Sequence, residues 1–131
     1  MPRVFKTRHF ARWASKAGLP DATLCAAVQE MAAGLVDADL GGGVVKKRVP
    51  LPGRGKRGST RTLVATNRKD RWFFLYGYEK NERDNIEQNE LHAFRELATD
   101  LLGMGDASLE ARIRNGKIEE ICHDQDPQPP A

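Results

Sequence analysis

Few features of membrane, secreted or cofactor-binding proteins occur in this sequence of 131 residues. No apolar run approaches the roughly 18 residues needed to cross a bilayer, and the charged N-terminus lacks the apolar region of a signal peptide. Only two cysteines occur, Cys25 and Cys122, which are too few for a cysteine-only zinc site. We therefore expect a cytoplasmic protein with no membrane partner, in which the thiols stay reduced and no disulfide scaffold forms.

Motifs for triphosphate binding and for metal chemistry are also missing or weak. The glycine-rich segment Gly53–Gly58 does not match the P-loop pattern. Metal-dependent nucleases need clustered carboxylates, whereas the basic segment Lys46–Arg71 contains a single acid, Asp70. The three histidines lie in different predicted elements, although folding could bring His9 to a site. We therefore expect neither a metal nor a cofactor.

Charge is distributed unevenly along the chain, although the net charge is only +3. Residues 1–80 carry 16 basic and 6 acidic side chains, whereas residues 81–131 carry 5 and 12. Ten lysines and arginines fall within Lys46–Arg71. The alternative interpretation is a solvated edge strand whose charges prevent pairing with the edge of another sheet, but such a strand needs fewer cations. The concentration of positive charge favours binding to a nucleic acid.

Apolar periodicity predicts an α+β domain with the order β-α-α-β-β-β-α and a small, mainly antiparallel sheet. The predicted elements are strands at Arg3–Thr7, Val44–Leu51, Ser59–Thr66 and Arg71–Tyr78, and helices from Arg8, after Asp21 and around Leu91–Leu101. Asp21 is the expected N-cap of the second helix, whose apolar stripe runs to Leu35. The main domain is expected to span residues 1–102, and residues 103–131 to form an extension with a short helix, a short strand and a mobile tail.

The segment Arg71–Tyr78 has the strongest strand pattern in the chain. Strict alternation places one set of side chains on one face, namely Trp72, Phe74, Tyr76 and Tyr78, and the other set on the opposite face, namely Phe73, Leu75 and Gly77. Because apolar residues lie on both faces, we expect a central strand that is covered on both sides.

The cations could support metal-free cleavage of RNA. Attack by a ribose 2′-hydroxyl requires proton removal, stabilisation of the charge that develops on the phosphoryl group, and protonation of the leaving oxygen. Arginine or lysine can provide the stabilisation, and a lysine among like charges can transfer a proton. Tyr76 or Tyr78 could stack on a base or donate a proton, although alternating aromatic residues more often belong to a core.

Three local signatures follow one another in the basic half and beyond it. They are Lys46-Lys47-Arg48 before a Pro/Gly-rich loop, Gly55–Gly58 running into Arg61–Val64, and the segment Leu75–Ile86. Together with the element order they resemble the RelE/ParE superfamily of type II toxins, and within it the RelE-like group related to HigB toxins, over about residues 3–102. The resemblance implies a RelE-like microbial ribonuclease-type fold and an endoribonuclease that cleaves mRNA in the ribosomal A site. Its implied partners are mRNA, the ribosome and a cognate antitoxin, expected to be a small helix-turn-helix DNA-binding protein.

The resemblance also implies roles for individual residues. The catalytic candidates are Arg61, Lys47, Lys80, Arg83 and Tyr78. The RNA-binding candidates are Lys46, Arg48, Arg54, Lys56 and Arg57. Two positions depart from the best-studied branch of the family, because Asn81 stands where that branch has an arginine and Glu87 stands near its C-terminal tyrosine. Arg83, Lys56 or Arg57 would then replace the arginine, and Tyr76 or Tyr78 the tyrosine.

Two other functions are compatible with these residues. Superfamily members related to ParE inhibit DNA gyrase instead of cutting RNA, and a non-catalytic nucleic-acid-binding protein could retain the same fold. The dense cationic segment favours the ribonuclease.

Overall fold

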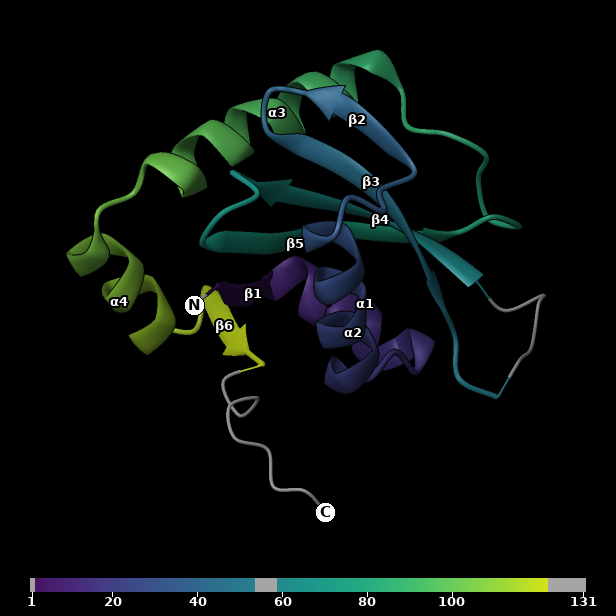
Figure 1. The fold of residues 1–131 in the computed structure, drawn as a ribbon, viewed down its shortest axis with the longest axis horizontal. Helices are drawn as coiled ribbons and strands as arrows, with labels where there is room; N and C mark the ends of the chain where they lie inside the picture. The colour runs from purple at the N-terminus through teal and green to yellow at the C-terminus, as the bar shows by residue number, and fades with distance from the viewer. Residues whose placement is uncertain (1, 54–58, 123–131) are drawn as a thin grey trace.

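A six-stranded sheet forms the centre of the molecule (Figure 1). The computed structural model describes residues 2–53 and 59–122. The strands are β1 (Arg3–Thr7), β2 (Ala38–Gly41), β3 (Val44–Pro50), β4 (Ser59–Thr66), β5 (Arg71–Glu79) and β6 (Ile118–Ile121). The helices are α1 (Arg8–Ala17), α2 (Asp21–Ala32), α3 (Gln88–Gly103) and α4 (Asp106–Arg114). The spatial order is β2-β3-β4-β5-β1-β6, in which β1 and β5 are parallel and the other neighbouring pairs are antiparallel.

The α+β class and the mainly antiparallel sheet are confirmed, but the element order differs from the predicted one. The additional strand β2 precedes β3, because Gly41, Gly42 and Gly43 all have positive φ angles, from 63° to 85°. Glycine adopts this left-handed backbone without steric cost, so the chain reverses tightly and β2 pairs with β3. The short helix and strand expected after residue 103 are present as α4 and β6.

One face of the sheet, called here the α2 side, is covered by α1 and α2 (Figure 1). Its core contains Phe10 and Ala14 from α1, Leu24, Val28 and Met31 from α2, and Val45, Val64, Trp72 and Phe74 from the strands. The predicted apolar stripe of α2 is confirmed only as far as Met31. The helix ends at Ala32, so Leu35 lies beyond it and its relative exposure is 59%.

The predicted N-cap role of Asp21 is wrong. Pro20 occupies the cap position, and Asp21 is the first residue of α2. Its carboxylate accepts a hydrogen bond from Lys6 Nζ at 2.8 Å instead. Because Lys6 is buried in β1, this ion pair ties the start of α2 to the sheet.

The opposite face, called here the α3 side, is covered by α3 (Figure 1). Leu91, Ala98 and Leu101 of α3 pack with Phe5, Leu63, Ala65 and Phe73 of the strands. The strand β5 therefore contributes to both cores, as its apolar pattern predicts.

Strict alternation along β5 is interrupted at Leu75. Leu63 of β4 pairs with Tyr76, but the next residue, Val64, pairs with Phe74, so Leu75 is an extra residue in β5. Such a β-bulge moves every later side chain to the opposite face. Tyr76 and Tyr78 consequently share the α3 side with Leu63, and the predicted placement of these tyrosines on the face of Trp72 is wrong.

The same register places Gly77 on the α2 side, under α1. A Cβ atom at Gly77 would lie 2.2 Å from the six-membered ring of Trp13, so only glycine leaves room for this indole. Trp13 is half-buried and packs against the α2-side core. The contact holds α1 directly against the end of β5.

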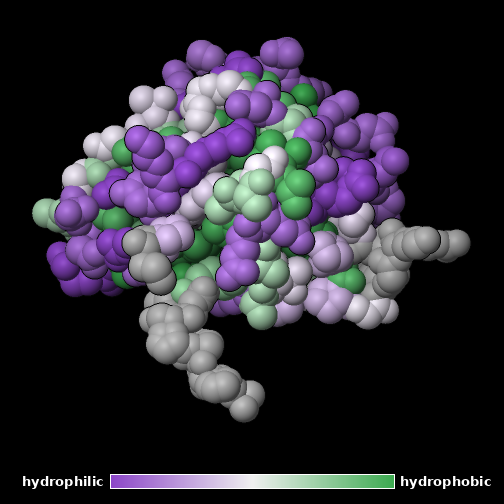
Figure 2. Space-filling model, in the orientation of Figure 1, coloured by the Kyte–Doolittle hydropathy of each residue, from purple (hydrophilic) through white to green (hydrophobic). Residues whose placement is uncertain are grey.

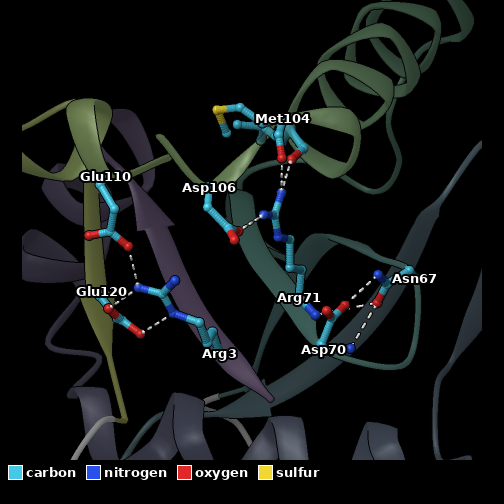
Figure 3. Close-up of polar contacts among 9 residues, drawn as sticks. Arg3, Asn67, Asp70, Arg71, Met104, Asp106, Glu110 and Glu120 are labelled. Atoms are coloured by element: carbon cyan, nitrogen blue, oxygen red, sulfur yellow. Dashed lines mark hydrogen bonds and ion pairs between the residues drawn. The ribbon is translucent and has the colours of Figure 1, made fainter. Parts of the chain in front are cut away.

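The β4–β5 turn is the one that the sequence predicts at residues 67–70. The side-chain oxygen of Asn67 accepts hydrogen bonds from the backbone N–H groups of Lys69 at 2.9 Å and Asp70 at 3.1 Å. Figure 3 shows Asn67 beside Asp70. The amide of Asn67 also donates to Asp70 Oδ1 at 2.7 Å, and this bond lowers the pKa of the Asp70 carboxyl. An asparagine that closes its own turn in this way fixes the hairpin register.

Two arginines attach the C-terminal elements to the sheet (Figure 3). Arg3 of β1 donates to both oxygens of Glu120 in β6 at 2.9 and 2.8 Å. Arg71 of β5 donates to the carbonyl of Met104 at 2.6 Å and pairs with Asp106 at 3.2 Å, at the connection from α3 to α4. The elements α4 and β6 are thus joined to the same sheet as the preceding residues.

The expectation that the two thiols remain separate is contradicted. Cys25 of α2 and Cys122 form a disulfide with Cα atoms 5.7 Å apart, across a sequence separation of 97. The physical reason is that β6 pairs with β1, with Ile121 opposite Val4, so the chain leaves the sheet beside α2. The predicted mobile tail at residues 123–131 lies outside the described residues.

Most of the face seen in Figure 2 is hydrophilic, and hydrophobic residues appear there as smaller patches. No helix in the described part of the chain is both long and apolar enough to cross a bilayer.

Substitution of Gly77 by alanine tests the contact that seats α1. We expect Gly77→Ala to lower the free energy of unfolding by about 1–3 kcal/mol, because the added methyl group collides with the Trp13 ring. Urea unfolding followed by circular dichroism measures the change. The matched control is Gly103→Ala, because a Cβ there meets no heavy atom within 4 Å among the described residues. Equal unfolding midpoints for the two variants would contradict the proposed constraint.

Candidate nucleic-acid interface

Three predicted RNA-contacting cations share the α3 side of the sheet. Lys46 pairs with Leu63, a member of the α3-side core, and Arg48 pairs with Arg61 two residues further along β3. Because directly opposed residues in antiparallel strands project from the same face, Lys46, Arg48 and Arg61 lie together. Arg48 is exposed, and the other two are half-buried.

The opposition of Arg48 and Arg61 is electrostatically unfavourable. Like charges directly opposite each other destabilise a strand pair. A bound anion such as a phosphate would relieve this repulsion and could be held by both guanidinium groups. The like-charged pair is therefore an observation that points to an anionic ligand.

Two aromatic residues complete this face because of the bulge at Leu75. Tyr78 pairs with Arg61 in the strand register, and the rings of Tyr76 and Tyr78 lie 6.1 Å apart. Tyr76 is half-buried, whereas Tyr78 is only 2% exposed. Tyr78 thus lies beside Arg61, but its side chain is far less accessible than that of Tyr76.

The phenol of Tyr78 is held in its neutral form. Its hydroxyl is buried and has no hydrogen-bond partner among the described residues. Burial raises the pKa of Tyr78, and the positive charges of Arg61 and Arg83 partly oppose this effect. A protonated phenol at this place can donate a hydrogen bond but does not act as a base.

Arg83 lies at the boundary between the tyrosines and α3. Its guanidinium donates to the Tyr76 hydroxyl at 3.3 Å and forms two hydrogen bonds with Glu90 at 3.0 and 2.5 Å. It also lies over the ring of Tyr78, with the guanidinium carbon 5.9 Å from the centroid. The hydrogen bond with Glu90 raises the pKa of Arg83 and lowers that of Glu90. Because its charge is partly neutralised by Glu90, Arg83 is better placed to position the tyrosines than to hold a phosphate alone.

Lys47 does not join the other cations, contrary to the sequence prediction. Alternation along β3 directs it to the α2 side, where it is 7% exposed. Its ammonium donates to the carbonyl of Leu35 at 3.0 Å and pairs with Glu30 of α2 at 2.7 Å. Lys47 is therefore a structural link between β3 and α2.

Lys80 is exposed in the turn that follows β5. Its neighbour Glu79 pairs with Thr60 of β4, so Lys80 lies at the same end of the β4–β5 pair as Arg61. The remaining predicted RNA-binding residues, Arg54, Lys56 and Arg57, lie outside the described residues.

A second wall of the site comes from α1, of which the sequence singled out only His9 as a residue that folding could bring to a site. A pocket of ≈540 Å³ lies between α1 and the end of β5, and four α1 residues line it, namely His9, Arg12, Trp13 and Lys16. The imidazole of His9 stacks on the ring of Tyr76, with centroids 5.9 Å apart and planes at 6°. The signal in the sequence is the helical spacing of these four residues, which places them on one side of α1.

The arrangement can bind an anion and a planar ring side by side. The described residues contain no group of three or more His, Cys, Asp or Glu that could hold a metal ion. The groups that are present are guanidinium and ammonium cations next to aromatic rings, a combination that proteins use for single-stranded nucleic acids.

Comparison with protein families gives one match. The family model described as the RelE toxin of the RelE/RelB toxin–antitoxin system matches residues 2–121, which include α4 and β6. A search of curated proteins gave no match.

The repulsion between the opposed arginines predicts a gain in stability when one charge is removed. We expect Arg48→Gln to raise the free energy of unfolding by about 0.2–1 kcal/mol at low ionic strength, and the gain to shrink when salt screens the charges. Thermal unfolding at two salt concentrations measures the difference. The control is Arg114→Gln on the exposed end of α4. A less stable Arg48→Gln variant at low salt would show that the two charges do not repel.

The buried hydroxyl of Tyr78 predicts that Tyr78→Phe folds as well as the wild type. Removing an unpaired buried hydroxyl should leave the free energy of unfolding unchanged or raise it by about 1 kcal/mol. Because burial raises the pKa of Tyr78 above its ordinary value of about 10, the neutral phenol contributes fully to the stability of the folded protein below that pH. This contribution is lost as the pH rises through the folded-state pKa. Chemical unfolding at pH 8 and above pH 10 should show that the free energy of unfolding falls less for Tyr78→Phe than for the wild type. A variant that is markedly less stable at pH 8 would reveal a partner for this hydroxyl.

Proposed function

This chain belongs to the RelE family of toxins of toxin–antitoxin systems, and we propose that it is a ribosome-dependent endoribonuclease that cleaves mRNA in the cytoplasm without a metal ion. Within the family we place it with the RelE-like group related to HigB toxins, on the strength of the segment Leu75–Ile86. The observation that carries the activity is the opposition of Arg48 and Arg61 beside the two tyrosines on the α3 side.

The proposed reaction is an attack by a ribose 2′-hydroxyl on the adjacent phosphate. The bond from the 2′-oxygen to phosphorus forms while the bond to the 5′-oxygen breaks, which leaves a 2′,3′-cyclic phosphate and a 5′-hydroxyl end. The 2′-hydroxyl loses its proton, and the departing 5′-oxygen gains one. No oxidant or cofactor is needed for this exchange.

Arg61 and Arg48 are the groups that we assign to the phosphate. Two guanidinium groups can stabilise the extra negative charge on the phosphoryl oxygens as the new bond forms. The phosphodiester already carries a negative charge when it binds, so the contacts that favour the transition state are those that strengthen as the additional charge develops. Arg61 is the more central of the two because it lies between Arg48 and Tyr78 in the strand register.

The proton transfers are assigned to groups of this face that solvent can reach. Lys46 and Tyr76 are half-buried and Lys80 is exposed, so each can contact an RNA strand. Tyr78 and Arg83 act as positioning residues, because the first is buried and the second is paired with Glu90. Lys47 has no part in the proposed site.

The family also implies an antitoxin that binds this toxin. We propose that the antitoxin is a small helix-turn-helix DNA-binding protein and that acidic residues or a folded segment of it cover Arg48 and Arg61. Charge complementarity with the cationic face supports this proposal.

Expression of variants in cells tests the ribonuclease directly. We expect the wild type to arrest growth and to create new mRNA 5′ ends within translated regions, and Arg61→Ala to reduce this cleavage by at least about 100-fold, because a transition-state contact with a charge is lost. Sequencing of 5′ ends measures both. The control is Arg114→Ala, which removes an arginine from the exposed end of α4.

Three outcomes would contradict parts of the proposal. Undiminished cleavage by Arg61→Ala would exclude this residue from the mechanism. Growth arrest without mRNA cleavage, together with inhibition of DNA supercoiling by purified protein, would favour a gyrase inhibitor. Binding of RNA without cleavage on purified ribosomes would identify a non-catalytic protein of the same fold.

A further inference from the structure

The pocket between α1 and β5 has its origin in the unequal lengths of two strands. β1 pairs with β5 only at residues 71–74, and the chain then turns into α1 at Arg8. The last part of β5 therefore has α1 beside it, where another strand would otherwise pair. The resulting pocket of ≈540 Å³ falls within the size range of small-ligand sites.

The polar groups of this pocket are mainly cationic. Arg12 and Lys16 are exposed on α1, one helical turn apart, and Arg83 faces them from the segment after β5. Glu82 is the one acid among the described lining residues. It accepts a hydrogen bond from the backbone N–H of Glu79 at 2.9 Å, so one of its oxygens is already engaged. An anionic group is therefore best placed at the Arg12 and Lys16 end.

The remaining walls are aromatic. Trp13 and Tyr76 are both half-buried and line the pocket, and His9 stacks on Tyr76 at its edge. Rings that stay partly exposed beside cations can stack on a base while the cations hold the adjoining phosphate. Both halves of a nucleotide thus have a matching wall.

A neighbouring pocket provides a contrast. It has a similar size, ≈570 Å³, and shares His9 and Tyr76, but Phe94, Leu97, Leu101 and Ile118 line it together with the cations Arg8, Arg112 and Lys117. Arg8 already donates to the carbonyls of Asn115 and Gly116, and Arg112 pairs with Asp100 at 3.0 Å. A charged ligand would have to displace these partners there. The cationic pocket is the favourable place for a phosphate-bearing ring.

We propose that the pocket between α1 and β5 binds one nucleotide of the single-stranded RNA substrate next to the scissile phosphate. The base stacks on Trp13 next to Tyr76, and its phosphate binds Arg12 and Lys16. Tyr76 belongs to both the pocket and the proposed catalytic face. The identity of the bound base therefore influences which phosphodiester bond is cut. The position next to the scissile phosphate rests on the proposed function, whereas the binding of the nucleotide does not.

Nuclear magnetic resonance of the full chain tests the binding step without ribosomes. The two indole N–H groups serve as probe and internal control, because Trp13 lines the pocket and Trp72 is 1% exposed. The ligand is a 2′-O-methylated tetraribonucleotide, which cannot be cleaved by attack of a 2′-hydroxyl. We expect its addition to shift the Trp13 signal in a saturable manner and to leave the Trp72 signal in place.

Two double variants with equal loss of charge separate a specific site from general electrostatic attraction. We expect Arg12→Gln with Lys16→Gln to weaken oligonucleotide binding about tenfold, because two phosphate contacts are lost. The matched control is Arg114→Gln with Lys117→Gln, which removes two exposed cations that do not line this pocket. Equal weakening by both pairs, or an unmoved Trp13 signal, would overturn the proposal. An equal shift of Trp13 with inorganic phosphate would show an anion site without base stacking and would overturn it as well.

Cleavage of mRNA on purified ribosomes completes the test. If the pocket selects a base, the Arg12 and Lys16 variant should cut with altered position preference and raised KM, while Arg61→Ala loses the reaction. Normal cleavage with an unmoved Trp13 signal would disprove the pocket and leave the proposed function standing. Binding at Trp13 without any cleavage by the wild type would support the pocket and disprove the proposed function.

Discussion

One extra residue in a strand, Leu75, determines what the rest of the candidate site contains. Without it, alternation would place Tyr76 and Tyr78 against α1 and α2, and Gly77 would face α3. With it, both tyrosines share a face with Arg61, and Gly77 leaves the space in which the Trp13 ring is seated. Bulges of this kind redirect side chains next to functional sites in many sheets. The aromatic end of β5 and the seat of the Trp13 ring both follow from this single shift in register.

The contacts that stabilise the molecule lie mainly outside the candidate site. Apolar cores lie on both sides of the sheet, and ion pairs made by Arg3, Arg71 and Lys47 join the helices and C-terminal elements to the strands. The candidate site, in contrast, contains opposed arginines and a buried phenol without a partner among the described residues. Both features cost stability in the free protein. Under the proposed function, a bound RNA phosphate would relieve the first of these costs, the repulsion between the arginines.

The sequence predicted those features that depend on local pattern. The helical periodicity before Gly18, the turn closed by Asn67, the two-sided burial of β5 and the resemblance to RelE toxins all concern neighbouring residues or composition. Features that depend on long-range geometry were missed. Nothing local shows that Leu75 is a bulge, that Lys47 meets Glu30 on the other side of the sheet, or that β6 brings Cys122 to Cys25. The α1 wall of the site was not predicted, because cations at this helical spacing are equally typical of a solvated helix face.

The central claim is that guanidinium groups on the α3 side, and no metal ion, drive attack by a ribose 2′-hydroxyl. The most direct measurement is the end chemistry of a defined mRNA cut by purified protein on ribosomes. The account predicts fragments with 2′,3′-cyclic phosphate and 5′-hydroxyl ends, which attack by a 2′-hydroxyl leaves. Fragments that carry 3′-hydroxyl and 5′-phosphate ends, which attack by a metal-activated water leaves, would contradict it.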